Sequence, residues 1–307
     1  RADGICGRMI TANVFDVKRF SINDGDGIRT TIFLKGCPLR CLWCQNPEGL
    51  IPEIQLWYAK TLCVSCKSCI AACEVHALNW DERGVAIDQA ACTRCGACVT
   101  ACPTGAIRFD AREMSTQDVL FEIEKDVPFY GKDGGVTLSG GECMASPAFS
   151  LEILRGCRER GIGTSIETSL YAKPETVDAF AEAADQIIAD IKLIDPARHK
   201  AATGVDNALI LSNIQRLASC GANLLIRVPL IPGYTDDDEN ITGIARFVAS
   251  LDRQIPVELL NFNPMCRDKY DAMREEYAFA PDQREISQER VHKLNQILES
   301  HGLTVIK

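Results

Sequence analysis

Eleven of the sixteen cysteines in this chain fall into three tight groups, and no other feature limits its fold so strongly. Neighbouring thiols in such short runs converge, which makes poor disulfide frameworks and suits a metal ion or an iron–sulfur cluster. We therefore expect metal chemistry in a reducing cytoplasm. The other five cysteines are scattered, and we expect them to pack as small apolar side chains, with Cys143 and Cys266 nearest the site. These five are Cys6, Cys143, Cys157, Cys220 and Cys266.

The first group is Cys37, Cys41 and Cys44, directly after an apolar run at 31–35 that predicts a buried strand. Three thiolates can hold three irons of a [4Fe–4S] cube and leave the fourth iron without a protein ligand. An open metal position is what a catalytic metal site needs. The alternative is a zinc site with a distant fourth ligand, which the other two cysteine groups disfavour.

The second and third groups are two copies of the run Cys-x2-Cys-x2-Cys-x3-Cys, and they resemble the bacterial two-cluster ferredoxins. In those proteins the fourth cysteine of each run ligates the other cluster. Two ligand sets follow, and a zinc ribbon matches eight cysteines in this pattern poorly. One cube is assigned Cys63, Cys66, Cys69 and Cys102, and the other is assigned Cys73, Cys92, Cys95 and Cys98.

After residue 110 the pattern alternates between short apolar runs and amphipathic segments. Such alternation predicts an α/β fold with a parallel sheet, either open or a partial barrel, whose active residues sit at the carboxyl ends of the strands. The expected strands are 136–138, 162–167, 186–190, 223–228, 257–261 and 303–306. The expected helices are 146–160, with Ser146 as cap, 174–184, 208–220, 237–251 and 287–301.

Polar residues follow several of these strands. A glycine pair lets backbone approach a ligand closely, and an adjacent carboxylate can accept hydrogen bonds from an ammonium group. Taken alone, each motif also fits an ordinary turn or a surface ion pair of little energetic weight. The residues are Gly140, Gly141, Glu142, Glu167, Thr168, Asp190, Lys192, Arg227 and Asn263.

Together the motifs resemble the radical SAM (S-adenosylmethionine) superfamily, and more narrowly its glycyl-radical-enzyme activating enzymes. The segments that carry the resemblance are 21–29, 33–37 and 43–48, and it runs from about Val14 to the C-terminus. It implies a partial (β/α)6 barrel of residues 9–59 and 110–307, with a small α+β dicluster ferredoxin domain inserted at 60–109. It also implies three [4Fe–4S] clusters and one bound SAM.

The resemblance further implies how the cofactor is held and used. SAM chelates the open iron, an electron cleaves it, and the resulting 5′-deoxyadenosyl radical takes a hydrogen from a glycine of a partner glycyl radical enzyme. Relatives place an aromatic residue near the adenine, and Trp43 stands there, although a core tryptophan is the alternative. The Gly140-Gly141-Glu142 turn would meet the methionine ammonium, with Cys143 replacing the family's proline.

The remaining positions carry over in the same way. Asp190 and Lys192 would contact the ribose and carboxylate side of SAM, and Arg227 its carboxylate. Glu167 and Asp190 are candidates for a monovalent cation. Asn263 stands where some relatives have a histidine, and an amide cannot titrate.

Bulk properties limit the partners. A net charge of -9 disfavours a nucleic-acid backbone, and no apolar run is long enough for a membrane span. No signal peptide is visible, so we expect a cytoplasmic monomer whose partners are a glycyl radical enzyme and a flavodoxin or ferredoxin donor. Two alternatives remain: a radical SAM enzyme for another peptide or small molecule, and an electron-transfer protein with three clusters. The second leaves Gly140, Asp190 and Lys192 unexplained.

Overall fold

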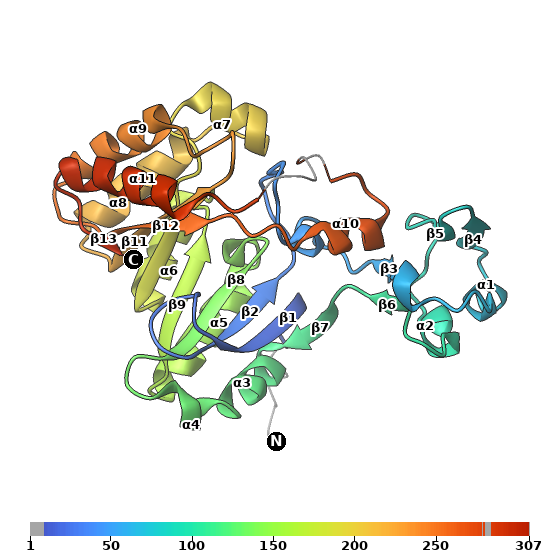
Figure 1. Cartoon of the computed structure of the whole chain (residues 1–307). Coiled ribbons are helices and arrows are strands. Elements are labelled where there is room, and N and C mark those ends of the chain that lie inside the picture. Colours follow the sequence, from blue (N-terminus) through green and yellow to red (C-terminus); the bar gives the residue numbers. More distant parts are fainter. Residues whose placement is uncertain (1–8, 278, 280–283, 307) are drawn as a thin grey trace, which may run out of the picture.

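A computed structural model describes residues 9–277, 279 and 284–306 (Figure 1). Its main sheet has nine strands and is open, with β7 and β13 at its edges. All neighbours from β2 to β13 are parallel, whereas β1 pairs antiparallel with β2 and β7. The strand order is β7 (Arg112–Ser115), β1 (Thr11–Ser21), β2 (Arg29–Leu34), β8 (Gly135–Gly140), β9 (Gly163–Thr168), β10 (Gln186–Asp190), β11 (Leu224–Leu230), β12 (Val257–Asn261) and β13 (Val305–Ile306).

Helices connect these strands, and their apolar faces join the strands in one large core. Their starts carry the expected signals: Ser115 and Asp118 form a capping box, and the side chains of Asp237 and Ser287 accept hydrogen bonds from first-turn N–H groups. The helices are α3 (Thr116–Glu124), α4 (Val127–Tyr130), α5 (Pro147–Glu159), α6 (Pro174–Ala183), α7 (Pro196–Thr203), α8 (Ala208–Ser219), α9 (Asp238–Ala249), α10 (Arg267–Met273) and α11 (Gln288–Ser300).

The α/β prediction with a mostly parallel sheet is confirmed, and β10 and β12 have the predicted bounds. Ser146 stands at the N-cap position of α5, before Pro147, as predicted, but its side chain makes no capping hydrogen bond. Among the described residues no helix is long and apolar enough to cross a membrane. Of the scattered cysteines, Cys6 lies outside the described residues, Cys220 is exposed, and the other three are buried.

The cysteine-rich segment, residues 60–109, lies to one side of the main sheet (Figure 1). It has its own small core, in which Leu56, Tyr58 and Ile107 pack against Cys69, Cys73 and Cys98. The pairing of β3 with β6 joins residues 56–58 to this segment. Its elements are β3 (Leu56–Tyr58), α1 (Ser68–Ala71), β4 (Leu78–Asp81), β5 (Gly84–Ile87), α2 (Ala97–Ala101) and β6 (Ile107–Phe109), and 310 turns lie at Pro47–Gly49, Lys60–Leu62 and Cys143–Ala145.

The two cysteine runs fold alike. Each has left-handed backbone at the second and fourth positions after its first cysteine and at the third position after its last. Only glycine adopts this conformation without steric cost. Because Ser65, Lys67 and Arg94 also adopt it, the fold of the two cysteine runs must hold these residues in it. The matched pairs are Ser65 and Arg94, Lys67 and Gly96, and His76 and Gly105.

A buried ion pair joins the segment to the main sheet. Lys35, next to the end of β2, places its ammonium 2.5 Å from the carboxylate of Asp110, next to the end of β6. The same ammonium donates to the Glu48 carbonyl at 2.6 Å, and Asp110 also accepts from the Gln55 amide at 2.8 Å. Both side chains are almost fully buried, so neither can lose its partner without leaving a charge in the interior.

Candidate active site

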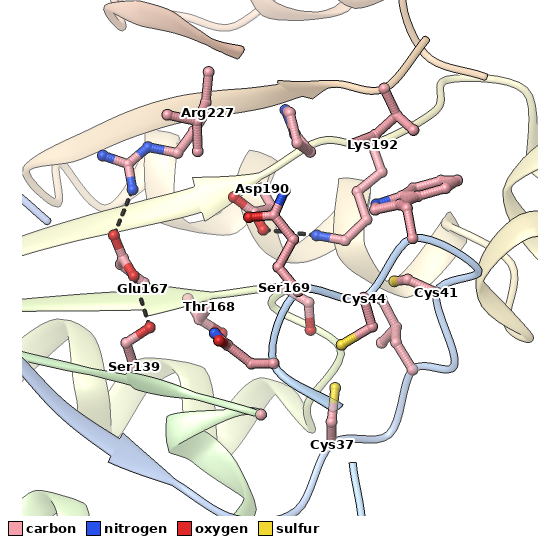
Figure 2. Close-up of a pocket in the computed structure, with 18 of the residues that line it drawn as sticks. Cys37, Cys41, Cys44, Ser139, Glu167, Thr168, Ser169, Asp190, Lys192 and Arg227 are labelled. Carbon is pink, nitrogen blue, oxygen red and sulfur yellow. Dashed lines mark hydrogen bonds and ion pairs between the residues drawn. The ribbon is translucent and has the colours of Figure 1, made fainter. Parts of the chain in front are cut away.

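A cavity of about 240 Å³ opens at the carboxyl ends of β8 to β12. This is the edge at which active residues gather in parallel sheets. Figure 2 shows the three cysteines on one side and the charged residues of β9, β10 and β11 on the other. The predicted residues that line the cavity are Cys37, Cys41, Trp43, Cys44, Gly140, Gly141, Glu167, Thr168, Asp190, Lys192 and Arg227.

The three cysteines come from the loop that follows β2. The loop is pinned to the end of α7, because the Arg40 and Leu42 amides donate to the carbonyls of Thr203 and Ala202 at 2.7 and 3.0 Å. Burial raises the pKa of the Cys37 thiol to about 12 and also raises the pKa values of the Cys41 and Cys44 thiols. A bound metal reverses that preference and takes thiols as thiolates.

Among the described residues no three His, Cys, Asp or Glu side chains are arranged to hold a single metal ion. A cubane makes a different demand, since each thiolate binds its own iron. Three thiols beside an open cavity fit such a group and leave space at its fourth corner. The donor set therefore fits a [4Fe–4S] cluster.

Glu167 and Arg227 form the charged wall on the β9–β11 side. The Glu167 carboxylate accepts from the Ser139 hydroxyl at 2.6 Å and pairs with the Arg227 guanidinium. Burial raises the pKa of Glu167 to about 6, with Arg227 acting in the opposite direction. The guanidinium also donates to Glu258 at 2.7 Å and to the Asn23 carbonyl at 3.0 Å. The Arg227 guanidinium is thus bound by three groups of the protein, and we interpret it as a residue that positions Glu167.

Asp190 and Lys192 face the cysteine loop from the end of β10, with 2.6 Å between ammonium and carboxylate. Burial is the largest influence on the pKa of Lys192 and would lower it. The Asp190 carboxylate and the sulfurs of Cys41 and Cys37 together outweigh burial, so the pKa is raised and the side chain stays cationic. Trp43 is buried against Tyr234, with ring centroids 5.4 Å apart, and still lines the cavity. The position of Trp43 is therefore compatible with both interpretations: a tryptophan of the core, and a wall against which the adenine of a bound ligand could pack.

The glycine pair has a clear packing reason. A Cβ on Gly140 would come within 2.2 Å of the Leu34 amide nitrogen, and one on Gly141 within 2.2 Å of the Gly49 carbonyl oxygen. Real Cβ atoms do not approach so closely, so only glycine lets this turn lie against the cysteine loop. We expected the pair to let backbone approach a ligand, and the structure shows it approaching Leu34 and Gly49.

Two predicted residues lie outside the cavity wall. The Glu142 carboxylate is buried and accepts from the hydroxyls of Thr168 and Ser169, each at 2.7 Å, and from the Ser169 amide at 2.9 Å. It ties the glycine turn to the end of β9. Asn263 is exposed, and its side-chain oxygen accepts from the Met265 amide at 3.0 Å.

Other residues at the cavity did not stand out in the sequence. Ser139, Ser169, Asn261 and Phe262 line it. Each stands at the last position of a predicted strand or one or two positions after it, which is the signal that could have found them. Short polar residues at strand ends are too common for that signal to select them alone.

Helix α10 supports the cysteine loop from outside. The Tyr270 hydroxyl donates to the Cys44 carbonyl at 2.9 Å, and the Lys269 ammonium lies 2.7 Å from a Glu48 carboxylate oxygen and 3.1 Å from the Gln45 carbonyl. Directly after the helix, Arg274 pairs with Asp81 at the end of β4. One short helix therefore touches both the cysteine loop and the cysteine-rich segment.

That segment holds two smaller cavities, each lined by four cysteines. Cys63, Cys66, Cys69 and Cys102 line one, and Cys73, Cys92, Cys95 and Cys98 line the other. Backbone amides donate to the sulfurs at equivalent positions: Ser65 to Cys63 and Arg94 to Cys92, both at 3.4 Å. Although burial opposes it, hydrogen bonds from backbone amides such as Ile107 lower the pKa of Cys102 to about 7. These surroundings suit cysteines that bind an iron–sulfur cluster, because hydrogen bonds to the sulfurs help to set the reduction potential of the cluster.

The open parallel sheet and the three-cysteine loop beside a cavity define a class of protein. The family described as the Radical SAM superfamily matches residues 31–243, so the chain is a radical SAM protein. One relative is the trans-4-hydroxy-L-proline dehydratase activating enzyme of Clostridioides difficile. It is 41% identical to this chain, over 94% of this chain and 96% of the relative. The (2S)-3-sulfopropanediol sulfolyase activating enzyme of Bilophila wadsworthia (strain 3_1_6) is 43% identical over 88% and 91%. The chain belongs to the glycyl-radical-enzyme activating enzymes of this superfamily.

Proposed function

We propose that this enzyme reductively cleaves SAM and uses the product radical to take a hydrogen from a glycine of a partner glycyl radical enzyme. The observation that carries the proposal is the cavity of about 240 Å³, which has three cysteines on one wall and paired charges on the other. A [4Fe–4S] cluster on Cys37, Cys41 and Cys44 would supply the electron that breaks the sulfonium–C5′ bond.

The other residues bind and orient the cofactor. Lys192 and Asp190, opposite the cysteines, offer one charge of each sign to the zwitterionic methionine end and the ribose. Trp43 supplies an apolar wall for the adenine. Glu142 acts as a positioning residue, because its hydrogen bonds to Thr168 and Ser169 fix the glycine turn. The predicted monovalent cation stays a prediction, since Glu167 and Asp190 already face Arg227 and Lys192.

We also propose that the cysteine-rich segment is a dicluster ferredoxin domain that relays the electron. Its support is the pair of four-cysteine cavities with matching backbone turns and N–H···S hydrogen bonds. Cys95→Ala should leave SAM binding and dithionite-driven cleavage unchanged, and slow activation with a flavodoxin or ferredoxin donor about tenfold. Full-speed activation with the protein donor and without the auxiliary clusters would show that the relay is wrong.

A glycyl-radical EPR doublet is the direct test of the activity. The reconstituted enzyme is mixed anaerobically with SAM, reductant and a candidate partner encoded beside it, and the doublet and 5′-deoxyadenosine are measured together. The relatives' names cover a dehydratase, a sulfolyase and a choline trimethylamine-lyase, so partners of these reaction types are the first to try. Release of 5′-deoxyadenosine with a small molecule or another peptide, and no doublet with any such partner, would favour the alternative substrate class.

A further inference from the structure

We propose that an acidic electron-donor protein docks on the face of the cysteine-rich segment formed by Lys60, Leu62, Val64, Lys67 and Trp80, and reduces the cluster at Cys66 through it. The inference rests on the proposed relay and adds where the electron enters. We call these five residues the donor face.

Three of the five residues of the donor face line one cavity. Val64, Lys67 and Trp80 line the cavity together with Cys63 and Cys66. Val64 is 62% exposed and Trp80 38%, and Cys66 is itself exposed. A donor resting on these side chains would therefore lie directly against a ligand of the cluster, with no intervening layer of protein.

Three apolar side chains of this face are exposed. Leu62 is 46% exposed and stands two positions before Val64 in the chain, while Trp80 lies under the Lys67 ammonium at 5.2 Å from the ring centroid. A centre of apolar side chains with charges at its rim is the composition of protein interfaces. The cation–π contact holds Lys67 in place and keeps its charge at the rim.

The charge of the face selects an acidic partner. Residues 59–73 contain two lysines and no Asp or Glu, in a chain with a net charge of -9. Asp81, which follows Trp80, is already bound by Arg274. A positive patch on an otherwise acidic protein steers an acidic partner to one place.

The second four-cysteine cavity does not offer the same surface. Cys95 is exposed there, but the neighbouring charges are Glu74, Asp88 and Arg94, and the Arg94 guanidinium donates to the Ile54 carbonyl at 2.6 Å. That bond ties the Arg94 turn to the chain just before β3. The Cys66 side, with Lys67 and its exposed apolar side chains, is the one we assign to the donor.

The step itself is a one-electron transfer. The donor is oxidised by one electron, the cluster on Cys63, Cys66, Cys69 and Cys102 goes from the 2+ to the 1+ state, and no bond forms or breaks. The chain's own residues bind and orient the donor and exclude water between the two redox centres.

The test compares two charge-reversal variants of the full holoenzyme. K60E/K67E reverses the donor face, and K18E/K132E makes the same charge change at exposed positions of β1 and the turn after α4. The dissociation constant of an oxidised, acidic flavodoxin is measured by calorimetry at low and at moderate ionic strength. We expect K60E/K67E to weaken binding about tenfold and to flatten its salt dependence, and K18E/K132E to change it less than about twofold.

Two controls separate the possible failures. Dithionite-driven SAM cleavage should be unchanged in both variants, because no residue of the donor face touches the active-site cavity. Iron content of about twelve per chain shows that all three clusters are present. Wild-type affinity in K60E/K67E with full iron would overturn the docking proposal, whereas about four irons in the wild-type protein would overturn the relay on which it rests.

Discussion

The active-site cavity and the two cavities of the cysteine-rich segment use the same ligand in different surroundings. In the active site, three cysteines share a cavity of about 240 Å³ with Glu167, Asp190, Lys192 and Arg227. The other two cavities are much smaller, have four cysteines each, and are lined by a single charged residue, Lys67, among the described residues. A missing thiol and a charged wall make room for a zwitterionic ligand, whereas four thiols in an apolar wall saturate a cluster and leave it suited to electron transfer.

The largest expected effect comes from removing one cysteine from each kind of cavity, which tests this contrast directly. Cys41→Ala should abolish 5′-deoxyadenosine release with dithionite, and iron content should fall from about twelve to about eight per chain. Cys66→Ala should lose a similar amount of iron and still cleave SAM with dithionite. Iron analysis and chromatography of 5′-deoxyadenosine measure both.

Cys220→Ala is the matched control, since Cys220 is exposed and belongs to neither set. It should keep full iron and full activity. Loss of dithionite-driven cleavage in Cys66→Ala with the Cys41 cluster intact would mean that the two kinds of cavity do not act separately.

Much of this contrast could be predicted from the sequence, and the reasons are local. The cysteine spacing reveals three ligands of each set because these lie within a few positions of one another. The fourth ligands, Cys102 and Cys73, follow only from the resemblance to two-cluster ferredoxins. The strands β10 and β12 are short apolar runs between clear helix signals, so their bounds and the polar residues after them could be predicted.

What the sequence did not reveal depends on contacts between distant positions. Lys35 and Asp110 are 75 positions apart, and nothing in either neighbourhood indicates a buried pair. Glu142 turns away from the cavity because Thr168 and Ser169 offer it three hydrogen bonds, which only the folded sheet brings together. The antiparallel strands β1 and β7 and the short helix α10 lack a strong period and were missed for that reason.

Breaking the buried link between the two regions should have the next largest effect. Asp110→Ala leaves the Lys35 ammonium buried without its carboxylate, at a cost of about 3–5 kcal/mol. Local opening should then speed amide hydrogen exchange in β3 and β6 by about two to three orders of magnitude, measured by mass spectrometry under native conditions.

The double variant Lys35→Met/Asp110→Leu removes both charges and should restore most of the protection, since an apolar pair of similar volume often replaces a buried ion pair at little cost. Exchange in β9 and β10 should change little in either variant. Unchanged protection of β3 and β6 in Asp110→Ala would show that the segment is held to the sheet by other contacts.

Breaking the exposed link should have the smallest effect. Arg274 binds Asp81 at the surface, and its hydrogen bond lowers the pKa of Asp81 to about 2. A carboxyl group whose pKa is lowered by folding stabilises the fold at any pH above its ordinary pKa. That stabilisation is lost only as the pH falls toward 2. Between about pH 7 and pH 5 the pair is therefore fully formed, and its contribution should not change.

Arg274→Gln should increase exchange in β4 and β5 less than about tenfold at either pH, because exposed ion pairs contribute little. Arg267→Gln, at the first position of α10, is the matched control and should not change hydrogen exchange in β4 and β5. A larger change in Arg274→Gln, or one that varies between pH 7 and pH 5, would mean that α10 holds the cysteine-rich segment more firmly than its surface position implies. The main anchor would then be the helix that also supports the Cys44 loop, rather than Lys35 and Asp110.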